Sequence, residues 1–120
     1  MSSSAPDLTA WLNALGGLHD VTVTHMSWLP GESRLVLYMK DIYWNCEGYP
    51  EYPGPTPGSL ELLGVANFSS SVDAAAKTFW IYDCSAERVS GGYLVRLSTD
   101  AGEANLRCRA ANFPALAFKA

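Results

Sequence analysis

The residues that could do acid–base or nucleophilic chemistry are few and scattered along the chain. They are two histidines and three cysteines: His19, His25, Cys46, Cys84 and Cys108. His19 precedes Asp20, and a carboxylate beside a histidine can orient the ring of a general base. Because adjacent residues on a strand point to opposite faces, we expect these two side chains not to act together. We interpret the pair as one that satisfies backbone groups where a loop enters a strand.

Metal binding and nucleophilic catalysis have no supporting pattern either. A zinc site needs three or four ligands, and no Cys-x-x-Cys pair supplies them. His25 alternates onto the face of Val21 and Val23, so we expect it to be packed or half-exposed. Cys46 lies beside Glu47, and an acidic neighbour makes a thiol less reactive. The serines at 69–71 lack the Gly-x-Ser-x-Gly pattern, and no glycine-rich phosphate loop precedes a helix. We predict that the protein is not an enzyme and holds no metal or cofactor.

The most distinctive stretch is residues 41–58, which contain four prolines and three glycines. Each proline fixes φ and removes a backbone donor, so this stretch cannot continue a sheet. It contains acidic and aromatic side chains but no Lys or Arg. We predict a semi-rigid loop that displays its aromatic rings. The candidate binding residues are Tyr43, Trp44, Glu47, Tyr49, Glu51 and Tyr52.

Tyrosine and tryptophan are favoured at protein interfaces because they give a large contact area at a small entropic cost. Proline stiffening lowers the cost of ordering the loop on binding. The resulting hypothesis is a non-enzymatic protein-binding module whose acidic aromatic loop contacts a basic protein. A second interpretation is that the aromatic rings fold back and cap the open end of the sheet, and both can hold in part.

Two alternative functions stay open. One is a small-ligand pocket at the open end of a barrel, lined by Trp44, Tyr49 and Trp80. The other is a homo-oligomeric structural protein, such as a homodimer with a large apolar two-fold interface.

A short helix and a series of strands must position these residues. Residues 6–15 predict a helix, because Leu8, Trp11, Leu12 and Leu15 recur on one face before a Gly-Gly stop. Such a helix is too short to be stable alone, so we expect it to dock its apolar face on the sheet.

From residue 20 onward the apolar period changes from helical to two. Strands are predicted over 20–28, 34–44, 59–69, 78–88, 93–98 and 104–113, with Leu106, Cys108 and Ala110 facing inward. Residues 72–77 fit either a helical turn or an edge segment. The whole chain, 1–120, is then a single mainly β domain: an antiparallel β-sandwich or partly open barrel of about six strands with one short N-terminal helix packed on it.

A short sequence repeat occurs at the ends of two predicted strands. Residues 64–68 and 109–113 match at three of five positions, Ala-Asn-Phe. Duplication of a three-stranded half explains the match, and so does shared strand-end chemistry in which Asn favours a turn.

The net charge indicates which class of partner to expect, and the N-terminal sequence indicates the cellular compartment. The net charge of −4 argues against nucleic acid, and no apolar run reaches the length of about 20 residues that crosses a membrane. The start resembles no signal peptide, and an odd number of cysteines favours reduced thiols, so we expect a cytoplasmic protein. Residues 41–76 hold five acids and no base, whereas residues 77–120 hold six bases and four acids. We interpret these as complementary solvated surfaces.

The run Leu18-His19-Asp20-Val21, a strand, a short turn and the run Leu-Val-Leu-Tyr-Met-Lys-Asp at 35–41 resemble the start of a family. The family is the small, largely uncharacterised bacterial immunity-type β proteins of polymorphic toxin systems. The resemblance covers the first third of the chain, and the Pro-rich loop departs from it. It implies a non-enzymatic, partner-binding role and transfers no functional residue.

Overall fold

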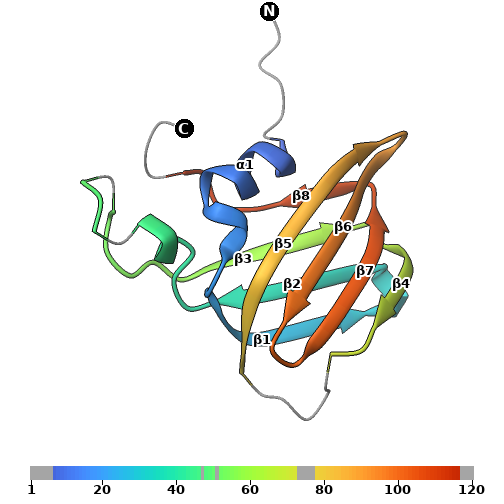
Figure 1. Cartoon of the computed structure of the whole chain (residues 1–120). Helices are drawn as coiled ribbons and strands as arrows, with labels where there is room; N and C mark the ends of the chain where they lie inside the picture. The colour runs from blue at the N-terminus through green and yellow to red at the C-terminus, as the bar shows by residue number, and fades with distance from the viewer. Residues whose placement is uncertain (1–6, 47, 51, 73–77, 117–120) are drawn as a thin grey trace, which may run out of the picture.

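The computed structural model describes residues 7–46, 48–50, 52–72 and 78–116. Within these ranges lie one α-helix, α1 (Leu8–Ala14), and the short 3-10 helices η1 (Gly16–Leu18), η2 (Pro30–Glu32) and η3 (Trp44–Cys46). The remaining elements, shown in Figure 1, are the strands β1 (Thr22–Leu29), β2 (Arg34–Met39), β3 (Gly58–Leu63), β4 (Ala66–Ser70), β5 (Phe79–Val89), β6 (Gly92–Thr99), β7 (Gly102–Cys108) and β8 (Ala110–Asn112).

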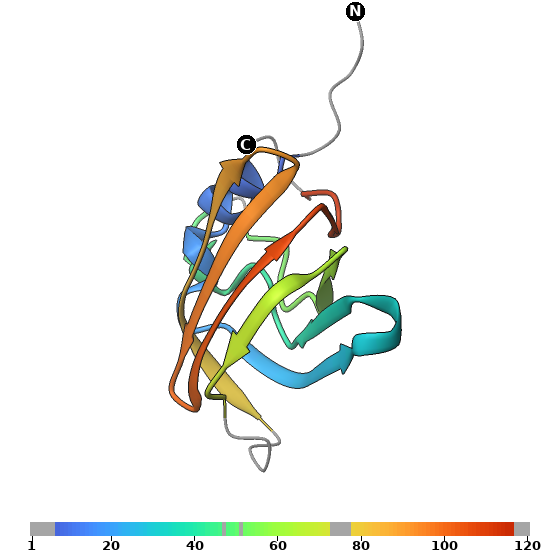
Figure 2. The ribbon, with the colours of Figure 1, turned by 90° about the vertical axis from the view of Figure 1, so that its right-hand side faces the viewer.

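The strands form one antiparallel sheet in the order β4-β7-β6-β5-β1-β2-β3-β8. The first and last strands of this order do not pair with each other in the described chain, so the sheet is not closed. Figure 2 shows the sheet curling so that β5, β6 and β7 form one layer, and the β1–β2 hairpin extends away from it. The prediction of a mainly β domain with one helix is confirmed, whereas six strands in a sandwich or barrel match this sheet only roughly.

The strand count was too low because two predicted strands change partners midway. The predicted strand 59–69 divides at Gly64, where β3 pairs with β2 and β8 but β4 pairs with β7. The predicted strand 104–113 divides in the same way at Arg109. At these corners the Val65 amide donates to the Ser33 carbonyl and the Arg109 amide donates to the Leu63 carbonyl, both at 2.8 Å. Ala110, predicted to face inward, is exposed because it follows the second corner.

Two further expectations about the first strands are wrong. The predicted strand 34–44 ends at Met39, so Tyr43 and Trp44 belong to the loop and not to the sheet. The register of β1 against β2 shifts at Thr24, which places His25 opposite Tyr38 on the exposed face. The two rings lie 5.5 Å apart at a tilt of 33°, so His25 is on the exposed face and not on the buried face of Val21 and Val23.

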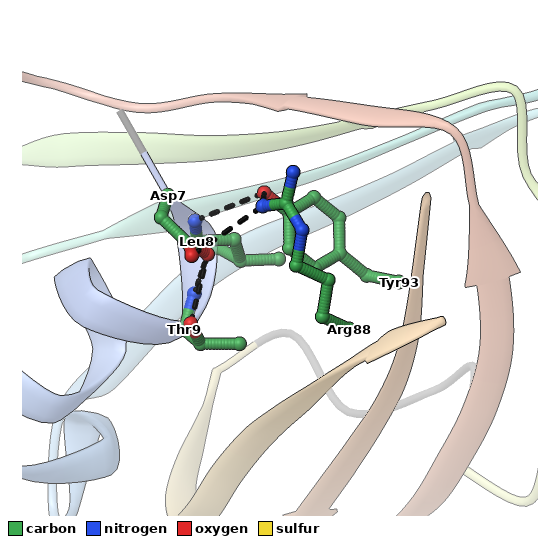
Figure 3. Close-up of polar contacts among 5 residues, drawn as sticks. All are labelled: Asp7, Leu8, Thr9, Arg88 and Tyr93. Atoms are coloured by element: carbon green, nitrogen blue, oxygen red, sulfur yellow. Dashed lines mark hydrogen bonds and ion pairs between the residues drawn. The ribbon is translucent and has the colours of Figure 1, made fainter. Parts of the chain in front are cut away.

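Helix α1 is attached at its N-terminus by a polar cluster on the β5–β6 hairpin (Figure 3). The Asp7 carboxylate accepts hydrogen bonds from the Thr9 amide at 2.9 Å and the Thr9 hydroxyl at 2.8 Å, which is an N-cap. These hydrogen bonds, with a smaller contribution from the Arg88 guanidinium 3.4 Å away, hold the pKa of Asp7 below its usual value. The Leu8 amide and Arg88 both donate to the Tyr93 hydroxyl.

The apolar face of α1 is part of the core, as predicted. Leu8 and Leu15 are completely buried, and Trp11 is 4% exposed. The Trp11 indole packs on Phe113 with ring centroids 4.8 Å apart and donates to the Pro114 carbonyl at 2.9 Å. The helix therefore joins β5 to the residues that follow β8. No helix in the described chain has the length and apolarity to span a membrane.

Replacing Trp11 with alanine should lower the free energy of unfolding by about 3–5 kcal/mol, because truncation of a buried aromatic ring leaves a cavity. Urea denaturation followed by circular dichroism measures the change. A variant that unfolds at the midpoint of the parent would contradict the docked helix. Asn13→Ala, a change on the opposite side of α1, is the matched control.

Candidate functional site

The loop of residues 41–57 is organised around one buried carboxylate. Asp41 is 7% exposed, and its Oδ1 atom accepts hydrogen bonds from the Tyr43 amide at 3.0 Å and the Thr56 amide at 3.1 Å. Its Oδ2 atom accepts the Tyr52 hydroxyl at 2.7 Å. The Ile42 amide donates to the Thr56 carbonyl at 3.0 Å and closes the base of the loop. A carboxylate needs such donors when it is buried, so both ends of the loop are fixed to one residue.

Between these ends, backbone hydrogen bonds connect described residues that lie three apart in the sequence. The Cys46 amide donates to Tyr43, the Tyr49 amide to Cys46 and the Tyr52 amide to Tyr49, at 2.8–3.0 Å. The Asn45 side-chain amide donates to the carbonyls of Leu15 at 3.1 Å and His19 at 2.8 Å. The loop is therefore attached to the end of the helical segment as well as to Asp41.

The candidate binding residues divide into an anchoring set and a displayed set. Tyr43 is buried at 2% exposure and Tyr52 is half-buried, so these two rings fold back on the domain. Trp44 is 46% exposed and Tyr49 is 64% exposed. In Figure 1 the loop extends from the side of the domain at the left. Glu47 and Glu51 lie outside the described residues.

The predicted pocket of Trp44, Tyr49 and Trp80 has no counterpart among the described cavities. Cavities of about 430, 320 and 280 Å³ are lined by other residues. Trp80 lies on the outer face of β5, where it is 56% exposed beside Tyr82 at 51%. These exposed rings form a second aromatic surface that the sequence pattern did not single out.

The histidine–aspartate pair connects the segment after η1 to β5. The His19 Nδ1 atom donates to the Tyr82 carbonyl at 2.7 Å, and the Asp20 amide donates to the Ile81 carbonyl at 2.7 Å. The His19 Nε2 and Asp20 Oδ2 atoms lie 3.5 Å apart, and both side chains are 58% exposed. We expected the two side chains to point to opposite faces of a strand. That expectation is wrong, because neither residue lies on a strand and their side chains approach each other. Both attach this segment to backbone carbonyls of β5.

The three cysteines are free thiols, as predicted. Burial, with a smaller contribution from Asp83, raises the pKa of Cys84 to about 12. Burial also raises the pKa of Cys108 to about 11. Both thiols are therefore protonated, and poor nucleophiles, at neutral pH. Among the described residues, no group of three or more His, Cys, Asp or Glu side chains could hold a metal ion.

Sequence reasoning missed the cavity of about 430 Å³, whose lining includes Arg107 and Arg109. Both residues lie on the predicted strand 104–113, and no function was assigned to them from the sequence. The excess of basic residues in the last third of the chain was the one signal that pointed to this region. The cavity forms where both strands change partners, which local periodicity does not reveal.

No family model matches the sequence, and no curated protein matches it. The fold is similar to a crystal structure of an uncharacterized protein from Neisseria gonorrhoeae, with a TM-score of 0.56 and 12% identity. The match covers 82% of this chain and 93% of that chain. At this identity the similarity is one of fold, and it extends over nearly the whole length of the solved protein.

Replacing Asp41 with alanine should destabilise the base of the loop, because it leaves the Tyr43 and Thr56 amides without their acceptor. Each unsatisfied amide costs about 1–3 kcal/mol where it is buried from water. Asp41→Asn keeps one oxygen for these amides and should cost less. Urea denaturation compares the variants, and equal stability of Asp41→Ala and the parent would show that the carboxylate does not fix the loop.

Proposed function

We propose that this chain is a non-enzymatic, cytoplasmic protein-binding module that uses the loop of residues 41–57 to contact a basic protein. The main support is that some residues of the loop anchor it to the domain while others remain exposed on it. Asp41, Tyr43 and Tyr52 hold it in place, and Trp44 and Tyr49 are left exposed on it. A loop ordered before binding loses little conformational entropy on association, so its exposed rings contribute more of their contact energy to affinity.

The charge of the loop supports a basic partner. The sequence from 41 to 58 contains Asp41, Glu47 and Glu51 and no Lys or Arg. Asp41 is buried and used internally, so the proposal assigns the contact with a basic partner to the charges of Glu47 and Glu51. Complementary charge raises the association rate and disfavours acidic competitors. A partner-binding role is also what the resemblance to immunity-type proteins implies.

The test compares two pairs of exposed aromatic residues on the same domain. Trp44→Ser with Tyr49→Ser removes the displayed rings of the loop, and Trp80→Ser with Tyr82→Ser removes rings of similar exposure from β5. Proteins crosslinked to each variant in a native lysate of the source organism are quantified by mass spectrometry. We expect the loop variant to lose about tenfold or more of a basic partner, while the β5 variant retains it.

Glu47→Lys with Glu51→Lys tests the charge, and Glu87→Lys with Glu103→Lys is its control on the sheet. Only the loop reversal should weaken capture of the basic partner. Capture that is unchanged by both loop variants would contradict the proposal. Loss of capture, or of self-association in sedimentation, with the β5 variant alone would assign binding to Trp80 and Tyr82 and favour the homodimer alternative.

A further inference from the structure

The cavity of about 430 Å³ lies between the two corners, at Gly64 between β3 and β4 and at Arg109 between β7 and β8. Its lining includes Ser33, Val65, Ser90, Tyr93, Arg107 and Arg109. In Figure 1 the ends of β6 and β7 near these corners lie at the right, away from the loop of residues 41–57. No residue of that loop lines the cavity in the described chain, so the two sites are separate.

The cavity is positively charged in a protein whose net charge is −4. Arg107 and Arg109 are both in its lining, and no acidic residue of the described chain is. Other arginines have acidic partners: Arg34 Nε lies 3.1 Å from Glu61, and Arg88 lies 3.4 Å from Asp7. Among the described residues, Arg107 and Arg109 make no such ion pair. Two arginines without an ion pair in the lining of one cavity favour an anion.

Glycines let the backbone and the arginine stem come close at this point. A Cβ atom on Gly64, whose φ is +64°, would lie 2.9 Å from Cγ of Arg109. A Cβ atom on Gly92 would collide with the Cys108 carbonyl oxygen and approach the Arg109 Cα atom to 2.8 Å. The stem of Arg109 is therefore held against the corner, which limits the freedom that its guanidinium would lose on binding.

We propose that this cavity binds the phosphate group of a small molecule. Guanidinium groups bind phosphate oxygens through paired hydrogen bonds, and the two serine hydroxyls in the lining are further donors. The volume lies within the range of about 300–1,000 Å³ that is typical of ligand sites and exceeds the needs of a phosphate ion. Val65, Val89 and the Tyr93 ring supply apolar surface for the rest of the ligand.

Phenyl phosphate is a suitable probe because it joins a phosphate to an apolar body. Titration into the 15N-labelled protein should shift the amide signals of Gly64, Val65, Gly91 and Gly92. Inorganic phosphate should shift the same signals with weaker affinity, and benzoate should bind more weakly than phenyl phosphate. Equal binding of benzoate would overturn the preference for phosphate.

Arginine variants show whether the cavity itself binds the probe. Arg107→Gln should weaken phenyl phosphate binding about tenfold, as expected for the loss of a charge-assisted contact. This variant leaves the packing of Arg109 on Gly64 intact, so it keeps the test valid if changes at Arg109 impair folding. Arg96→Gln, on an exposed arginine of β6 that does not line this cavity, should change the affinity less than twofold.

The absence of any shift, binding unchanged by Arg107→Gln, or an equal loss in Arg96→Gln would overturn the proposal. The last of these outcomes would show that the probe responds only to general positive charge. Because the loop of residues 41–57 takes no part in this titration, the result is independent of partner capture by Trp44 and Tyr49.

Discussion

The buried carboxylate of Asp41 is the constraint on which the geometry of the loop of residues 41–57, the proposed binding surface, depends. It accepts hydrogen bonds from two backbone amides and one tyrosine hydroxyl, from residues as far along the chain as Thr56. The prolines of the loop cannot donate backbone hydrogen bonds, so side chains must supply much of its cohesion. This arrangement leaves Trp44 and Tyr49 exposed while the Tyr43 amide and the Tyr52 hydroxyl are held by Asp41.

The sheet contains two corners at which a strand exchanges its pairing partners. At Gly64 and Arg109 the chain leaves one set of partners and joins another, and these corners create the cavity that contains Arg107 and Arg109. The two copies of the short sequence repeat, residues 64–68 and 109–113, begin at these two corners. Periodicity predicted the strands themselves, but the alternation of buried and exposed side chains breaks at each corner, as at Ala110, and it did not predict the division of two strands into four. That division follows from pairing between distant segments.

The candidate site was also predictable in part. Proline content identified the loop with Tyr49 and Tyr52 in it, whereas Tyr43 and Trp44 were also assigned to the end of the preceding strand. Which rings are exposed was not predictable, because that depends on Asp41 and on the docking of Asn45 at the end of the helix. Trp80 was included in the alternative of a ligand pocket because its neighbours in space could not be inferred from its position in a strand.

The proposed binding mode requires a loop that is already ordered in the free protein. The 15N relaxation of the Trp44, Cys46, Tyr49 and Tyr52 amides tests this most directly, because it measures motion without any partner. We predict order parameters close to those of β2 and β3, about 0.85. Values below about 0.6 for these amides would show a flexible loop and would contradict the account.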